Sequence, residues 1–111
     1  MFRNLKVLVQ RDPEAQHIWV AQTLQGDIVG QGSTMREAIQ DLRGALLTFF
    51  FRKQELVSTL APSEDWSLFE ETVFKGTPVH DIPDEGIFAF WFRVIYGGCE
   101  MLPLAFHLEA R

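Results

Sequence analysis

The side chains of this sequence that could bind a metal or take part in acid–base catalysis are few and scattered. His80 and Asp81 are the one adjacent pair of a histidine and a carboxylate, and prolines flank the segment in which they lie. A metal site needs several His, Cys, Asp or Glu ligands at defined spacings, and the other histidines, His17 and His107, show no such spacing. The pair therefore supports one alternative hypothesis, a small-ligand or metal-dependent enzyme, beside the simpler interpretation of a loop histidine.

Cys99 is the only cysteine of the chain. A single cysteine excludes an intramolecular disulfide framework and a cysteine-rich zinc site. A nucleophilic cysteine needs a cationic neighbour or a helix N-terminus that lowers its pKa, whereas Cys99 precedes the acidic Glu100. We therefore expect a structural thiol that is at least partly buried, and we predict no catalytic residue, no metal ligand and no cofactor.

Length and composition indicate one folded domain without a nucleic-acid surface. The 111 residues are 47% hydrophobic, which is ample for a packed core. The net charge of −5 argues against nucleic-acid binding, because contacts to a phosphate backbone need clustered Lys and Arg. No signal peptide is recognisable, and the densest apolar run, residues 87–96, contains Arg93 and is too short to span a bilayer. We expect a cytoplasmic protein with no membrane partner.

Three short strands are predicted in the first part of the chain. Residues 3–10 and 16–24 are rich in β-forming side chains, and residues 28–30 make a third, shorter run. Asp12-Pro13-Glu14 and Gln25-Gly26-Asp27 separate these runs with turn-forming residues. The pattern predicts three strands joined by tight turns.

The clearest element of the sequence is a helix over residues 34–53. Thr34 and Glu37 fit a capping box, in which each side chain bonds a backbone amide of the first turn. Apolar residues then recur in steps of three and four at Met35, Ala38, Ile39, Leu42, Ala45, Leu46, Phe49 and Phe50. Leu47 and Phe51 form a second stripe off this face, which either the following segment covers or another subunit does.

The order of several short motifs resembles a known family. These motifs are Trp19-Val20-Ala21, Gln31-Gly32-Ser33-Thr34, Glu37-Ala38 and Leu42. With them, residues 3–53 resemble the small domain of HicB-like antitoxins. The resemblance implies an α+β fold in which a three-stranded meander packs on one helix, with residues 87–96 as a displaced fourth strand. It also implies binding of a small basic toxin. The C-terminal DNA-binding segment that such antitoxins often carry is not recognisable here.

The second half of the chain is acidic. Residues 61–111 carry nine acidic and three basic side chains, and seven of the nine lie between residues 64 and 85. Residues 63–75 are expected to form a short helix with Ser63 as N-cap, and residues 77–86 a loop. An acidic surface suits a basic partner, beside the simpler interpretation of a solvated face. The candidate partner-binding residues are Glu64, Asp65, Glu70, Glu71, Asp84 and Glu85.

The chain is expected to end in an aromatic β-hairpin. Residues 87–96 and 99–108 flank the turn-forming pair Gly97-Gly98, and Pro103 favours an edge position or a bulge. Both faces of the first of these strands are apolar, so that strand is either sandwiched between layers or in contact with another subunit. The candidate oligomer-interface residues are Leu47, Phe51, Phe88, Phe90, Trp91 and Phe92.

We therefore predict a single α+β domain over residues 1–111. Its parts are a β-β-β-α core over residues 3–60, an acidic connection over residues 61–86 and a hairpin over residues 87–109. The function predicted is that of a non-catalytic protein-interaction module, which self-associates and binds a small basic toxin-like protein. The alternatives are an enzyme that uses His80 and a transcriptional regulator.

Overall fold

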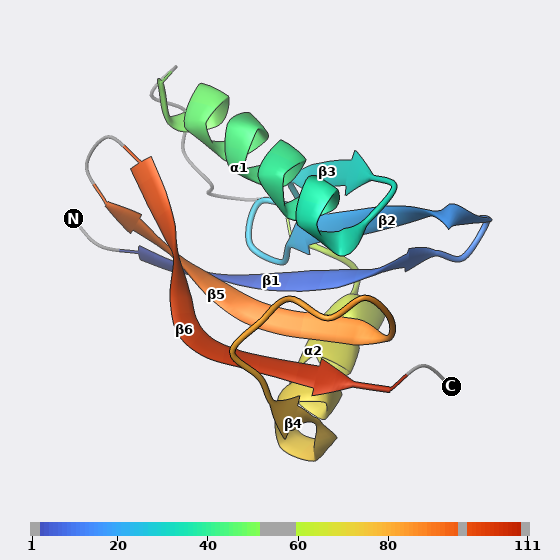
Figure 1. The fold of residues 1–111 in the computed structure, drawn as a ribbon. Helices are drawn as coiled ribbons and strands as arrows, with labels where there is room; N and C mark the ends of the chain where they lie inside the picture. Colours follow the sequence, from blue (N-terminus) through green and yellow to red (C-terminus); the bar gives the residue numbers. More distant parts are fainter. Residues whose placement is uncertain (1–2, 52–59, 96–97, 110–111) are drawn as a thin grey trace.

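The computed structural model describes residues 3–51, 60–95 and 98–109 as a six-stranded antiparallel sheet with one helix on each face (Figure 1). The elements are β1 (Arg3–Asp12), β2 (Ala15–Thr23), β3 (Val29–Gly32), α1 (Met35–Phe51), α2 (Ser63–Lys75), β4 (Thr77–Pro78), β5 (Ile87–Ile95) and β6 (Gly98–Leu108). The predicted α+β class is confirmed. The continuation of the first helix beyond Phe51 and the turn at Gly97-Gly98 fall partly or wholly outside the described residues.

β1 lies in the middle of the sheet and joins the two halves of the chain. The strand order is β3-β2-β1-β5-β6-β4, so β1 pairs with β2 on one side and with β5 on the other. Val7 of β1 lies opposite Phe90 of β5. The strands of the second half therefore extend the meander of the first half into a larger sheet and do not form a sheet of their own.

The predicted capping box opens α1. The backbone amide of Glu37 donates a hydrogen bond to the hydroxyl oxygen of Thr34 at 3.1 Å. The carboxylate of Glu37 accepts a hydrogen bond from the backbone amide of Ser33 at 3.0 Å, one residue earlier than the usual capping box would place it. These bonds satisfy amides that the helix itself cannot. The Ser33 hydroxyl also bonds the Glu37 carboxylate, and this bond is the main cause of the lowered pKa of Glu37.

α1 packs closely on the face of the sheet formed by the first three strands. Ala38, Leu42 and Leu46 form the middle of its buried stripe and have no exposed surface. The close approach requires a glycine in β3, because a Cβ atom on Gly30 would lie 2.2 Å from the backbone nitrogen of Leu42. The first half of the chain is thus built around one contact between a helix and a strand.

α2 covers the opposite face of the sheet. Phe69 and Thr72 are buried beneath it, and Phe69 packs in a second core cluster with Leu8 and Ala89. The helix begins at Ser63 with Pro62 in the N-cap position and no side-chain cap, so the prediction of Ser63 as N-cap is wrong by one residue. Pro62 has an extended backbone (φ −55°, ψ 152°), which suits the residue before a helix.

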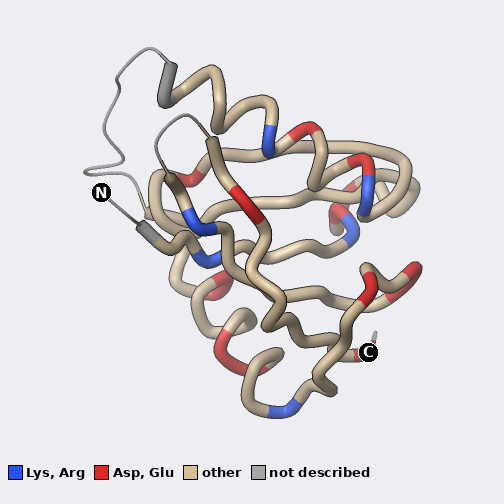
Figure 2. Tube along the Cα trace, turned by 60° about the vertical axis from the view of Figure 1, so that its left-hand side comes forward, with Lys and Arg blue, Asp and Glu red and all other residues tan. Residues whose placement is uncertain are grey.

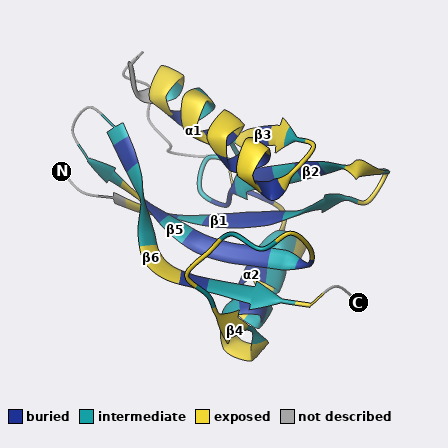
Figure 3. Ribbon diagram, in the orientation of Figure 1, coloured by how far each residue is buried: buried dark blue, intermediate teal, exposed yellow. Residues whose placement is uncertain are grey.

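Each face of β5 is covered by another part of the same chain. Phe88, Phe90 and Phe92 are at most 1% exposed and pack in the core on the α1 side. Trp91 points to the other face and packs against the α2 cluster. Figure 3 shows that the buried part of β5 lies between Phe88 and Phe92, whereas the strand is more open towards Ile95. The three phenylalanines are therefore core residues, and the expectation that they form an oligomer interface is corrected.

β6 bends strongly where its register with β5 shifts (Figure 1). Phe92 lies opposite Met101 and Phe90 opposite Ala105, so β6 holds extra residues between these pairs. Pro103 falls in this irregular stretch, which agrees with the expectation of an edge position or a bulge. A proline is tolerated there because its missing N–H breaks no regular ladder bond.

Side chains of α1 also bond the backbone of two strands that lie far apart in the sheet. The carboxylate of Asp41 accepts a hydrogen bond from the amide of Gln31 in β3 at 2.9 Å. The guanidinium of Arg43 donates to the carbonyl oxygen of Cys99 in β6 at 3.0 Å. Polar groups that an outer strand would otherwise offer to another chain are thereby occupied.

Candidate functional site

The exposed side of α2 carries the most unusual surface of the described chain. Along this side, in steps of three and four residues, lie Glu64, Ser67, Glu70 and Phe74. Phe74 is 87% exposed, the highest value among the exposed large hydrophobic residues of the described chain. Lone exposed apolar residues are common, but a fully exposed phenylalanine on a regular helix loses the free energy that its burial would provide.

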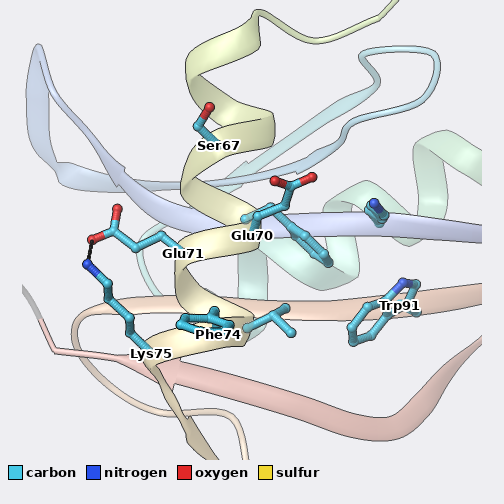
Figure 4. Close-up of a pocket in the computed structure, with 9 residues that line it drawn as sticks. Ser67, Glu70, Glu71, Phe74, Lys75 and Trp91 are labelled. Carbon is cyan, nitrogen blue, oxygen red and sulfur yellow. Dashed lines mark ion pairs between the residues drawn. The ribbon is translucent and has the colours of Figure 1, made fainter.

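Phe74 borders an open hollow of about 790 Å³ between α2 and the sheet. The hollow is lined by Lys6, Ser67, Phe69, Glu70, Glu71, Val73, Phe74, Lys75 and Trp91. Figure 4 shows Phe74 and Glu70 on α2, with Trp91 facing them from β5. Helix and sheet thus each contribute an aromatic side chain to the same space.

The wall of the hollow on the sheet side is fixed by aromatic packing. Trp91 meets Phe69 edge-on, with ring centroids 5.2 Å apart and an interplanar angle of 87°. Trp91 also meets Phe106 of β6 in an edge contact at 6.4 Å. A ring held from two sides loses little conformational entropy when a ligand packs on it.

Charged side chains surround this apolar wall. The ammonium group of Lys6 lies over the rings of Trp66 and Phe69, 5.2 and 5.6 Å from their centroids. Glu71 and Lys75 form an ion pair at 4.0 Å on one side of α2, whereas Glu70 stands nearer to Trp91 (Figure 4). The hollow therefore combines apolar, cationic and anionic groups.

Further carboxylates gather at the N-terminal end of α2. The amide group of Gln22 donates hydrogen bonds to Asp27 at 2.7 Å and to Asp65 at 3.3 Å. Partial burial raises the pKa of Asp65, the bond from Gln22 lowers it, and the charges of Glu64 and Asp27 raise it further. Three carboxylates, those of Asp27, Glu64 and Asp65, therefore lie near one another at this end of α2.

The six predicted partner-binding acids divide between two surfaces. Glu64, Asp65, Glu70 and Glu71 all lie on α2. Asp84 and Glu85 lie in the segment between β4 and β5, whose apolar residues pack in the core on the α1 side of the sheet. Figure 2 shows these acids as separate groups. The six candidate residues therefore do not share one surface, because the segment after β4 crosses to the other face.

Glu85 is engaged within the chain. It forms a bidentate ion pair with Arg11, which lowers the pKa of Glu85. The Arg11 guanidinium also lies over the ring of Trp19, 4.6 Å from its centroid. His107 places its Nε2 atom 2.7 Å from the backbone oxygen of Glu85. These contacts hold the segment before β5 against the sheet.

The remaining predicted oligomer-interface residues, on α1 and β5, differ from one another in exposure. Leu47 of α1 is 40% exposed and remains available to a partner. Phe51 is the last residue of α1, and its side chain lies outside what the structure describes. Trp91 is half-buried and lines the hollow beside α2.

The residues considered for catalysis do not converge. His80 and Asp81 are exposed between β4 and β5, and His17 is exposed on β2. Among the described residues, no group of three or more His, Cys, Asp or Glu could hold a metal ion. Cys99 is buried, and burial raises the pKa of its thiol although Arg43 acts in the opposite direction. A thiol in this state is a poor nucleophile.

A second hollow, of about 460 Å³, lies where the segment before β5 passes the start of α1. Trp19, Met35 and Ile82 line it together with Ser33 and Thr34. Both hydroxyls interact with the carboxylate of Glu37 in the helix cap. Both side chains therefore take part in the cap of α1.

Sequence reasoning missed Phe74, although a signal for it was present. The apolar side of α2 includes Phe69 and Val73, which lie four residues apart. Phe74 follows Val73 directly and is four residues from Glu70, so it belongs to the acidic side of the helix. An aromatic residue outside the apolar stripe is the pattern that would have identified it.

Comparison with other proteins leaves this surface as the basis for inferring function. No protein-family model matches the chain, and no curated protein and no solved structure matches it. In the described ranges, no helix is long and apolar enough to cross a membrane.

Proposed function

We propose that this chain is a non-catalytic protein-interaction module that binds a small basic protein, as a HicB-like antitoxin would. The observation that carries the proposal is the exposure of Phe74, 87% of whose surface is open, on a helix side that also carries Glu64 and Glu70. Aromatic side chains contribute strongly when a partner removes them from water. A surface of this kind gains most from a partner that supplies apolar contacts together with positive charge.

The charge on this face favours a basic partner. Around α2 lie five carboxylates, Asp27, Glu64, Asp65, Glu70 and Glu71, against two ammonium groups, Lys6 and Lys75. A field of this sign accelerates encounter with a basic protein and opposes binding of nucleic acid. The net charge of the whole chain, −5, acts in the same direction.

The order of elements supports the antitoxin aspect of the proposal. The first half runs strand, strand, strand and helix, which is what the resemblance of residues 3–53 to HicB-like antitoxins implies. The described part of the second half contributes α2 to one face of the sheet and three strands to the sheet itself. A role as an operator-binding regulator has less support, since the surface charge is negative.

Self-association remains part of the proposal with a reduced set of residues. With three of the β5 aromatics in the core, Leu47 on α1 and Trp91 at the hollow are the predicted interface residues that keep exposed surface in the described part of the chain. Light scattering of the purified chain at high micromolar concentration tests this aspect. If the parent chain has the mass of a monomer and Leu47→Ser leaves that mass unchanged, self-association is removed from the proposed function.

The experiment for the main proposal begins with the intact chain as bait in its native host. A bound small basic protein is purified separately and recombined with the chain, and the mass of the complex is measured by light scattering. The proposal predicts a stoichiometric complex that weakens as salt concentration rises. Failure of every captured protein to re-form such a complex contradicts it. Stoichiometric metal in the purified chain would instead favour the enzyme hypothesis with His80 and Asp81.

A further inference from the structure

We infer that the hollow between α2 and β5 is the docking site for an amphipathic segment of the partner that carries an arginine one helical turn from an apolar side chain. This inference rests on the proposed function and goes beyond it by naming the site and the chemistry of the segment. Three features of the hollow support it: the exposed ring of Phe74, the indole of Trp91, which neighbouring rings hold in place, and the carboxylate of Glu70 beside that indole.

The apolar part of the site is formed by Phe74, Val73 and Trp91. Phe74 stands at the rim with 87% of its surface exposed, while Trp91 is held in place by Phe69 and Phe106. A leucine or phenylalanine from a partner would contact the rings of Phe74 and Trp91 together. Such a contact removes apolar surface from water on both molecules.

The cationic part of the partner is specified by Trp91 and Glu70. A guanidinium group stacks on aromatic faces and donates paired hydrogen bonds to a carboxylate, so arginine suits this pair better than lysine. Glu71 already forms an ion pair with Lys75, whereas Glu70 lies nearer to Trp91 (Figure 4). Glu70 is therefore the carboxylate assigned to the arginine.

The spacing on α2 sets the spacing on the partner. Glu70 and Phe74 are four residues apart on one side of a helix, a separation of about 6 Å along the axis at 1.5 Å per residue. An arginine and an apolar side chain at positions i and i+4 of a partner helix match this distance. A basic amphipathic helix is the segment that meets both requirements.

Charge also decides against a second copy of this chain as the occupant. Two α2 helices facing each other would bring the acidic sides of both molecules together, and like charges across an interface oppose association. Pairing through strand edges has its own obstacle, because Asp41 and Arg43 occupy backbone groups of β3 and β6. A basic segment from a different protein meets neither obstacle.

A random-peptide selection tests this inference without knowledge of the natural partner. A phage-displayed library of 16-residue peptides is selected on the intact chain, and the enriched peptides are synthesised with a fluorescent label. The expected peptides carry an arginine and an apolar residue at i and i+4. Enriched peptides without arginine, or no enrichment, would overturn the inference.

Matched variants locate the binding. Affinity for the enriched peptide is expected to fall about tenfold in Phe74→Ser and in Glu70→Gln, as for residues central to an interface. Leu47→Ser, on α1 across the sheet, is the control for loss of an exposed apolar residue, and Glu14→Gln, in the exposed turn between β1 and β2, is the control for loss of a carboxylate. Both controls should bind within about twofold of the parent chain, because neither side chain meets the peptide's arginine or apolar residue. Equal losses in variants and controls would contradict the assigned site.

The inference and the proposed function can fail separately. A natural basic partner whose affinity is unaffected by Phe74→Ser and Glu70→Gln would overturn the docking site and leave the proposed function standing. Peptide binding at the hollow without any natural basic partner would leave the docking site standing and overturn the proposed function. Thermal unfolding of each variant by circular dichroism shows that a lost affinity does not come from a lost fold.

Discussion

The ring of Trp91 on β5 meets the ring of Phe69 on α2 edge-on, with centroids 5.2 Å apart. This contact joins the helix to the sheet and also fixes the wall of the hollow beside α2. Five residues further along the helix, Phe74 is exposed to solvent. α2 thus uses one phenylalanine to dock on its own sheet and presents a second one to the surroundings.

Truncation of the two phenylalanines should separate these roles. Phe69→Ala removes a side chain that is 2% exposed, and we expect a loss of about 3–5 kcal/mol in the free energy of unfolding, as for other buried phenylalanines. Phe74→Ala should change it by less than about 0.5 kcal/mol. Urea denaturation monitored by circular dichroism measures both. Equal effects would mean that α2 is docked differently.

Two glycines of the first half give opposite predictions. Gly30→Ala forces a Cβ atom to within 2.2 Å of the Leu42 backbone nitrogen, and overpacking of this kind destabilises by about 1–3 kcal/mol or more. Gly44 lies in the interior of α1 with no atom within 4 Å of an added Cβ, so Gly44→Ala should stabilise by about 0.5–1 kcal/mol. Melting temperatures that move in the same direction for both variants would refute the packing of α1 on β3.

The thiol of Cys99 should react slowly while the chain is folded. Burial raises the pKa of Cys99, so less thiolate is present near neutral pH than for a free cysteine, and access is restricted as well. Alkylation by iodoacetamide, followed by mass spectrometry, should be at least about tenfold slower in the folded chain than in guanidinium chloride. Equal rates in both states would show that Cys99 is not buried.

Asp65 and Glu37 should affect the pH dependence of stability with opposite signs. Partial burial raises the pKa of Asp65 in the folded chain, so its ionised form costs stability above its ordinary pKa of 3.8. Asp65→Asn should therefore stabilise the chain at pH 7, and the gain should vanish once the pH falls below that value.

The pKa of Glu37 is lowered by the bonds of the helix cap, so its contribution is present above its ordinary pKa of 4.5 and is lost as the pH falls through the lowered value. Glu37→Gln should destabilise at neutral pH and have little effect in acid. Denaturation curves at a series of pH values test both variants. If both variants changed the free energy of unfolding at neutral pH in the same direction, the environments assigned to Asp65 and Glu37 would be contradicted.

Local signals in the sequence predicted the elements well. The Thr34 and Glu37 cap and the steps of three and four after it predicted α1, because capping and periodicity depend only on neighbouring residues. Pro103 predicted the irregular stretch of β6 for the same reason. The mistake at Ser63 was small, since Pro62 already adopts the conformation of a cap residue.

Contacts between distant parts of the chain could not be predicted in this way. The pairing of β1 with β5 places Phe90 opposite Val7, and nothing local to either strand specifies the partner. Once that pairing and α2 are known, the two apolar faces of β5 no longer require a second subunit. The separation of Asp84 from the acids of α2 follows likewise from the path of the chain after β4.

Site-specific photo-crosslinking in the native host tests the central claim most directly. Benzoylphenylalanine is introduced in place of Phe74 in one experiment and in place of Leu47, on α1, in another. We predict that the probe on α2 crosslinks to one small basic protein identified by mass spectrometry, and that the probe on α1 does not. A basic protein crosslinked from Leu47 alone, or no basic protein crosslinked from either position, would contradict the assignment of α2 as the partner-binding surface.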